Sequence, residues 1–101
     1  MKLLDLLVQE FISITEHLLQ NYHINENNRI VIDRKEFQTL LTKYAFLTFH
    51  EKCRIYKQLN FILHDKNNYT LPCRIEGKTT RKVVINYNTY EIVKALQEVD
   101  I

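Results

Sequence analysis

The sequence contains one proline and one glycine in 101 residues, Pro72 and Gly77, so sharp backbone turns are restricted to few places. Around these two residues apolar side chains alternate with polar ones, as expected for the two strands of a hairpin. The alternating apolar sets are Leu71, Cys73 and Ile75, and then Val83, Ile85 and Tyr87. The two sets face each other if Cys73 lies opposite Val83. This register predicts a three-residue loop, residues 77–79, in which Gly77 supplies a left-handed conformation.

The predicted hairpin is basic, because it carries Arg74, Lys78, Arg81 and Lys82 against the single acid Glu76. The expected register places Arg74 opposite Lys82, and like charges in facing positions destabilise a sheet by up to about 1 kcal/mol. Phosphates bound along the hairpin would offset this repulsion and release counterions. The alternative interpretation is a solvated strand edge whose lysines prevent aggregation.

The charge of the chain changes sign along its length. Twelve Lys and Arg stand against five acids between residues 29 and 82. In residues 1–28 one cation stands against four acids, and in residues 83–101 one stands against three. A basic middle between two acidic ends favours a polyanion bound on one face of the molecule.

Apolar residues recur at helical spacing in four segments, and a short run of β-branched residues predicts a strand. The predicted helices are about the first 18 residues and residues 34–44, 49–63 and 88–98, and the predicted strand is residues 30–32. Asp33, Thr48 and Asn88 each precede a Glu by three positions, the pattern of a capping box at a helix start. Three residues, 45–47, join the second and third helices, as in a helix-turn-helix. One α+β domain, residues 1–101, is therefore expected.

Two elements supply the candidate DNA-contacting residues. The exposed face of the third helix and its surroundings contribute His50, Lys52, Arg54, Lys57, Gln58, Arg34 and Lys35. The hairpin contributes Arg74, Lys78, Thr79, Thr80, Arg81 and Lys82. Cations and amides of these kinds bind phosphates and base edges, although a basic helix face is also a common solvated surface.

Catalytic and metal-binding motifs are missing from the sequence. It has no glycine-rich phosphate loop, nucleophile elbow or HExxH motif, and Cys53 and Cys73 lack metal-ligand spacing. We therefore expect a non-catalytic protein without metal or cofactor. The apolar start is interrupted by Asp5 and Glu10, and no uncharged run reaches the length of a membrane span, which predicts a cytoplasmic protein without membrane contact.

The predicted order of helix, short strand, helix, three-residue turn, helix, basic hairpin and last helix resembles winged helix-turn-helix proteins. The resemblance covers almost the whole chain and rests on TLLTKYAFLTFHEKCRIYKQL for the helix-turn-helix and LPCRIEGKTTRKVVINY for the wing. It implies that the third helix reads the major groove of double-stranded DNA, while the wing contacts backbone or the minor groove. The wing is the more basic element, so we expect it to outweigh the helix.

Eleven Ile, nine Asn and two Ala indicate an AT-rich genome, and the chain resembles small winged-helix accessory proteins of relaxosomes on clostridial conjugative plasmids. This resemblance implies binding at a transfer origin and assistance to a relaxase or other transfer proteins. Two alternatives are a plasmid or phage transcriptional regulator and a protein-interaction module that binds an acidic partner. The wide apolar face of the first helix, with Leu6, Val8 and Ile12, predicts a homodimer unless the last helix covers it.

Overall fold

The computed structural model describes residues 2–99 as four helices and an antiparallel four-stranded sheet, an α+β fold. In chain order the elements are α1 (Leu3–Leu19), β1 (Arg29–Ile32), α2 (Arg34–Leu41), α3 (Phe49–Gln58), β2 (Ile62–Leu63), β3 (Leu71–Ile75), β4 (Lys78–Asn86) and α4 (Tyr87–Glu98). The predicted α+β class and the existence of the first helix, short strand, hairpin and last helix are confirmed. No helix within residues 2–99 is both long enough and apolar enough to cross a membrane.

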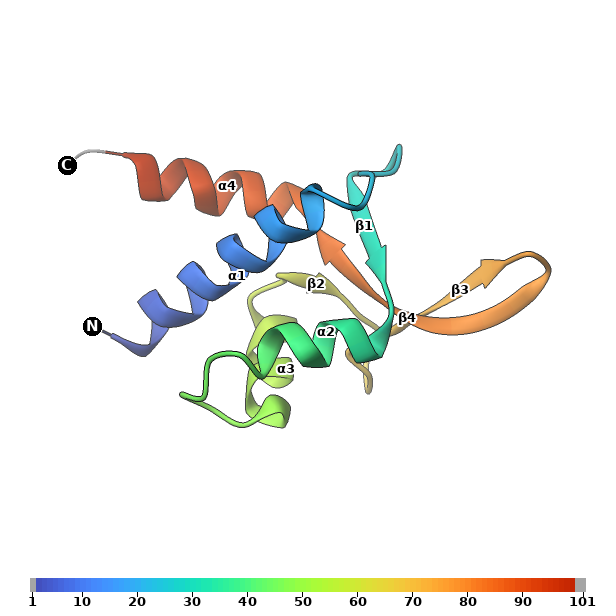
Figure 1. Ribbon diagram of the computed structural model, residues 1–101, viewed down its shortest axis with the longest axis horizontal. Coiled ribbons are helices and arrows are strands. Elements are labelled where there is room, and N and C mark those ends of the chain that lie inside the picture. Colours follow the sequence, from blue (N-terminus) through green and yellow to red (C-terminus); the bar gives the residue numbers. More distant parts are fainter. Residues whose placement is uncertain (1, 100–101) are drawn as a thin grey trace.

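Strand β4 organises the sheet because it pairs with all three other strands. Residues 78–82 pair with β3, and residues 83–86 pair with β1 and in part with β2. The first half of β4 is mostly exposed, whereas Val83, Val84 and Ile85 are buried. Figure 1 shows the β3–β4 hairpin projecting from one end of the molecule while α1 and α4 extend toward the other end.

The core fills the space between the second half of β4 and helices α1, α2 and α3. The ring of Phe11 from α1 stacks on Phe61 with a centroid separation of 4.1 Å, and Tyr56 of α3 meets both rings edge-on. Phe37 of α2 packs edge-on against Tyr56 at 5.9 Å. Burial of these rings removes a large apolar area from water and fixes how the helices sit on the sheet.

Helices α2 and α3 end earlier than their apolar spacing predicts. Helix α2 stops at Leu41, so Tyr44 is 49% exposed and the connection to α3 is seven residues, 42–48, instead of three. Helix α3 stops at Gln58 because Asn60 adopts a left-handed conformation, with φ 58°, and turns the chain into β2. Leu59, the residue after the helix, is consequently 36% exposed.

One of the three predicted capping boxes forms. The Thr48 hydroxyl accepts from the Glu51 N–H, and the Glu51 carboxylate accepts from the Thr48 N–H at 3.0 Å. Asp33 occupies the N-cap position of α2, but its carboxylate binds Lys82 instead of a helical N–H. Helix α4 begins at Tyr87, so its cap is Asn86 and not the predicted Asn88.

The hairpin register differs from the prediction by three residues. Cys73 lies opposite Thr80, not opposite Val83, and Arg74 lies opposite Thr79, not opposite Lys82. A two-residue turn of Glu76 and Gly77 closes the hairpin, with φ values of 52° and 79°. Two successive positive φ angles match the right-handed twist of the strands. The shift releases residues 83–85 to pair with β1 and β2 in the core, and it removes the predicted repulsion between Arg74 and Lys82.

Candidate nucleic-acid interface

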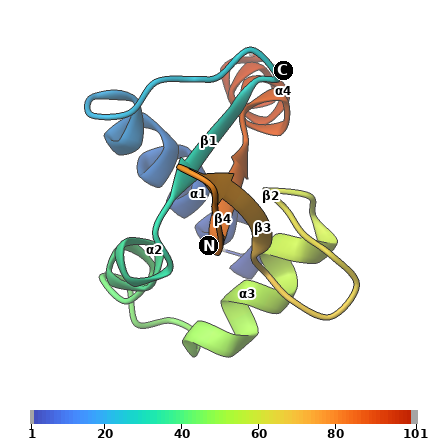
Figure 2. The same ribbon diagram turned by 90° about the vertical axis from the view of Figure 1, so that its right-hand side faces the viewer.

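The candidate interface spans α2, α3 and the hairpin, the elements that carry the predicted DNA-contacting residues. Figure 2, which views the molecule from the hairpin end, shows α2 and α3 on one side of the sheet and α4 on the opposite side. The loop that joins β2 to β3, residues 64–70, passes beside α3 in the same view. Helices α2 and α3 therefore share the side of the sheet opposite α4, and the hairpin projects from the sheet at one end of the molecule.

Helix α3 presents a polar face to solvent. His50, Arg54 and Gln58 are exposed and Lys57 is half-buried, in agreement with the helical spacing of these residues. Within residues 2–99, neither Arg54 nor Lys57 takes part in an ion pair. The capping box at Thr48 fixes the start of the helix, so this face is held by a rigid element and has free cations.

Lys52 is fully buried, which contradicts its assignment to the DNA-contacting face. Its Nζ lies 2.6 Å from Glu10 Oε2 and 2.7 Å from the Leu41 carbonyl oxygen, and it also donates to the Tyr44 carbonyl oxygen. The ammonium also sits 4.2 Å from the centroid of the Phe46 ring. The three donors of this cation thus tie the end of α2 and the 42–48 connection to α1 and α3.

Tyr56 completes this buried cluster, because its hydroxyl donates to Glu10 Oε1 at 2.8 Å. Burial and the neighbouring carboxylate raise the pKa of the Tyr56 phenol well above its ordinary value. The sequence contained a signal for the cluster: Lys52 lies three residues after Phe49 and four before Tyr56, on the apolar side of the helix. A lysine at such a position is buried only with a partner, and Glu10 on α1 is that partner.

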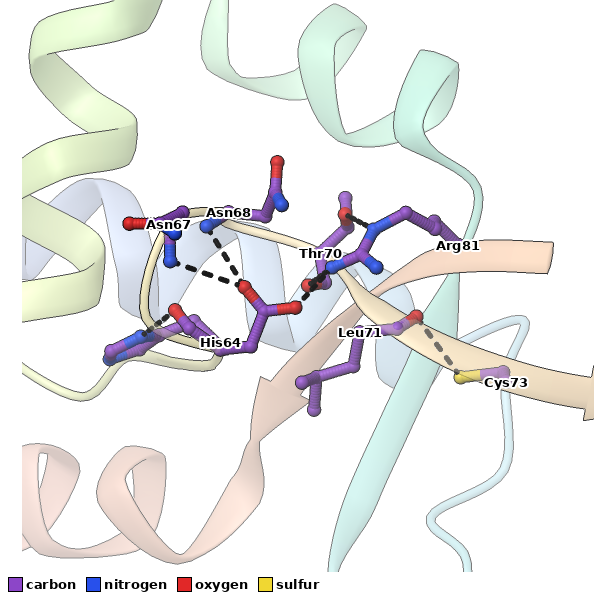
Figure 3. Close-up of polar contacts among 8 residues, drawn as sticks. His64, Asn67, Asn68, Thr70, Leu71, Cys73 and Arg81 are labelled. Atoms are coloured by element: carbon purple, nitrogen blue, oxygen red, sulfur yellow. Dashed lines mark hydrogen bonds and ion pairs between the residues drawn. The ribbon is translucent and has the colours of Figure 1, made fainter. Parts of the chain in front are cut away.

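Arg81 is engaged at the base of the hairpin, as Figure 3 shows. Its Nη2 donates to Asp65 and, at 2.8 Å, to the Thr70 carbonyl oxygen, and its Nε donates to the Thr70 hydroxyl at 2.9 Å. Asp65 also accepts from the backbone N–H groups of Asn67 and Asn68. The Arg81 guanidinium, followed by these N–H groups, lowers the pKa of the Asp65 carboxyl. Arg81 therefore fastens the 64–70 loop to β4.

Lys82 is also paired within the fold, because its ammonium binds the Asp33 carboxylate at the start of α2. Arg81 and Lys82 are the residues at which β4 passes from the hairpin into the main sheet. Asp65 and Asp33 therefore tie this point to the loop on one side and to α2 on the other. No sequence pattern pointed to these two pairs, since the partners lie 16 and 49 residues away.

The free cations of the hairpin are confined to its outer part. Arg74, Lys78, Thr79 and Thr80 are exposed, and neither cation lies in an ion pair within residues 2–99. Glu76 occupies the turn between them. The tip therefore carries two free cations and one free acid, fewer positive charges than the count from the sequence implied.

Arg34 and Lys35 form the first turn of α2, and both are exposed. They lie next to the Asp33–Lys82 pair and so border the base of the hairpin. These two exposed cations remain candidate contacts for an anionic partner.

Cys53 is buried, and burial raises the pKa of its thiol to about 12, so it is a packing residue.

Among residues 2–99 there is no group of three or more His, Cys, Asp or Glu side chains placed to hold a metal ion. The exposed polar groups of α3 and the hairpin are cations, amides and hydroxyls. No protein-family model matches the sequence, and a search among curated proteins finds no match.

Proposed function

We propose that the protein is a winged-helix domain that binds duplex DNA, with α3 in a groove and the β3–β4 hairpin as the wing along the backbone. The order of elements supports this proposal. A strand, β1, precedes the pair α2 and α3, and a hairpin follows the pair and extends from the same sheet. This order and pairing resemble those of winged-helix proteins.

The observation that carries the proposal is the set of free cations on one side of the molecule. Arg54 and Lys57 on α3 and Arg74 and Lys78 on the hairpin have no acidic partner within residues 2–99. Three nearby acids are engaged, since Asp33 and Asp65 pair with β4 and Glu51 caps α3, whereas Glu76 at the hairpin turn is free. A surface with four unpaired cations and one free acid attracts phosphates.

We assign the larger share of the binding to α3 instead of the hairpin, which revises the expectation from the sequence. The hairpin loses Arg81 and Lys82 to internal ion pairs, and Glu76 offsets part of what is left. Helix α3 loses Lys52, but its exposed face keeps Arg54 and Lys57 with the amide of Gln58 beside them. A guanidinium and an amide on one helix face are suited to base edges as well as phosphates.

A salt titration tests the proposal. The affinity for an AT-rich duplex is measured at several salt concentrations for the native chain, an Arg54→Ala/Lys57→Ala variant and an Arg74→Ala/Lys78→Ala variant. Each lost phosphate contact reduces the slope of log affinity against log salt by about 0.9. We expect the α3 variant to lose about two contacts and the larger part of the affinity.

The control for net charge is Lys2→Ala/Lys94→Ala, which removes two positive charges from the start of α1 and from α4, away from the hairpin; Lys94 pairs with Glu16, so this control does not remove two free cations. This variant should leave the salt slope close to that of the native chain, because salt screens the attraction between distant protein charges and the bound DNA. A native chain that ignores duplex DNA at low salt overturns the proposal. The same basic surface would then be tested against an acidic protein partner.

A narrower role, as an accessory factor of a relaxosome, adds two requirements to duplex binding. The protein must prefer repeated sites at a transfer origin, and it must contact a relaxase or another transfer protein. A transcriptional regulator requires instead a site that overlaps a promoter. Selection of binding sites from random duplexes, followed by mapping onto the source replicon, separates these two roles.

A further inference from the structure

The exposed apolar side chains of the molecule gather on its terminal helices. Five of the eight large apolar residues that are exposed within residues 2–99 belong to the first turn of α1 or to α4 and its C-cap. They are Leu3, Leu4, Ile92, Leu96 and Val99. Ile92 and Leu96 are 62% and 66% exposed. Exposed apolar patches of this kind mark an interaction surface.

Helix α4 uses one face within the chain and leaves another face exposed. Tyr90 packs on α1, where its hydroxyl donates to Glu16 at 2.8 Å, and the partly buried Val93 lies between this face and the exposed one. The other face carries Ile92, Leu96 and Val99. At 100° per residue, this second face points away from the one that meets α1. The chain's own first helix therefore cannot cover it.

The outer face has the spacing of a helix–helix seam. Ile92, Leu96 and Val99 are separated by four and then three residues, with Ala95 beside them, which is the repeat that packs knobs into the holes of a second helix. The seam residues carry no charge. Glu91 and Glu98 border the seam on one flank, while Thr89 and Val93 border it on the other.

The wide apolar face of α1, which suggested a dimer at the level of sequence, is largely used within the chain. Val8 and Ile12 pack against the core, and Leu6 is half-buried. The free apolar surface lies on α4 and on the first turn of α1. Figure 1 shows both of these at the end of the molecule opposite the hairpin. Any interface here leaves the hairpin and α3 accessible.

We propose that α4 pairs with α4 of a second copy of this chain, in parallel and around a two-fold axis along the seam. A short, uncharged seam is self-complementary, because a two-fold contact uses each apolar side chain in both copies. The acidic flank decides the orientation. In a parallel pair Glu91 and Glu98 face the uncharged flank of the second copy, whereas in an antiparallel pair the two acidic flanks face each other.

The size of the seam sets the expected strength of the dimer. Ile92 and Val99 are separated by about 10 Å along the helix, so the seam alone covers less than the roughly 800 Å² per copy of a standard interface. Leu3 and Leu4 are exposed at the same end but belong to α1, on the other side of α4, so they do not add to the seam. We therefore expect a dimer that dissociates on dilution in the micromolar range, and this inference does not rest on DNA binding.

Sedimentation equilibrium at several protein concentrations tests the proposal. Ile92→Glu and Leu96→Glu, made separately, should each raise the dimer dissociation constant by at least roughly tenfold. The matched control is Ile75→Glu, because Ile75 is 48% exposed on the hairpin and lies outside the seam. Both α4 positions are more than half exposed, so the variants should keep the native circular dichroism and melting curve.

A native chain that is monomeric at every concentration overturns the proposal, and so does a dimer that both α4 variants leave intact. A disulfide test addresses the orientation, using Ile92→Cys in a chain with Cys73→Ser. A parallel pair brings the two introduced thiols together, and mild oxidation should give a covalent dimer. An antiparallel pair separates them by about 10 Å along the helix, beyond the reach of a disulfide, so failure to crosslink overturns the parallel arrangement.

Discussion

Helix α3 and the β3–β4 hairpin both look basic in sequence, yet they divide their cations differently. In α3, Lys52 is fully buried and Arg54, two residues later, is exposed. In the hairpin the division follows the length of the strand, since Arg81 and Lys82 are paired at the base. The helix therefore separates structural from free cations by face, and the hairpin separates them by distance from the core.

The difference follows from the geometry of the two elements. A helix turns its side chains through 100° per residue, so neighbouring positions can face the core and the solvent. A hairpin that leaves the body of the protein has core neighbours only at its base. A count of charges along the sequence thus overstates the number of free cations on both elements, and variants of individual residues separate the structural cations from the free ones.

The largest effect is expected from Lys52→Met. The substitution keeps the side-chain volume but leaves the Glu10 carboxylate buried without its cation and the Leu41 and Tyr44 carbonyl oxygens without a donor. Removal of one partner of a buried pair costs about 3–5 kcal/mol of the free energy of unfolding. Urea unfolding at neutral pH measures this loss.

Arg54→Met is the matched control on the same helix, and it should change the unfolding free energy by less than about 0.5 kcal/mol. A double variant, Glu10→Leu/Lys52→Met, removes both charges and should recover part of the stability that Lys52→Met loses. Equal losses in Lys52→Met and Arg54→Met would contradict the division of cations on α3.

A smaller effect is expected at the hairpin turn. Gly77 has φ 79° with no atom within 4 Å of an added Cβ, so Gly77→Ala should cost only the backbone strain, about 1–2 kcal/mol. Glu76 also has a positive φ, 52°, and Glu76→Asn should stabilise the protein by a few tenths of a kcal/mol, because Asn tolerates this conformation better.

These two variants also distinguish the two-residue turn from the three-residue loop that the sequence predicted. In the three-residue loop Glu76 would belong to a strand, where Asn is less favourable than Glu. Destabilisation by Glu76→Asn in urea unfolding would therefore contradict the observed register.

Local sequence patterns predicted which segments form helices and strands, but contacts between residues far apart in the sequence set the register of the hairpin. The periodicity of Leu7, Phe11, Ile14 and Leu18 predicted α1, and all four are buried. The alternation of apolar and polar residues predicted the hairpin. Its register depends on β1 and β2, because these strands pair with residues 83–86 of β4 in the core. Alternation alone could not reveal this competition, because several registers place apolar residues on one face.

The capping boxes and the candidate site also show that local patterns do not reveal partners far away in the sequence. Thr48 has no competing partner and caps α3 as predicted, whereas the Asp33 carboxylate is drawn to Lys82, 49 residues away. The exposure of Arg54 could be predicted from helical spacing. The ion pair of Arg81 with Asp65 could not be predicted, because it depends on the conformation of the 64–70 loop, whose polar sequence has no recognisable pattern.

The smallest effect is expected from the pH dependence of the Asp65–Arg81 pair. The Arg81 guanidinium holds the pKa of Asp65 below its ordinary value of 3.8. A carboxyl with a lowered pKa in the folded state stabilises the fold at pH values above 3.8, and this contribution is lost as the pH falls through the lower folded pKa. The pair is more than a third exposed on both sides, so solvent screens it and the contribution is small.

Urea unfolding of the native chain and of Asp65→Asn, between neutral pH and strongly acidic pH, measures this contribution. The native chain should be slightly more stable at neutral pH, and the difference should vanish in acid. In an Arg81→Met background the effect of Asp65→Asn should shrink without disappearing, because the Asn67 and Asn68 N–H groups still bind the carboxylate. If Arg81→Met left the pH dependence unchanged, Arg81 would not be a structural cation at the base of the hairpin, and it would return to the candidate DNA-binding residues.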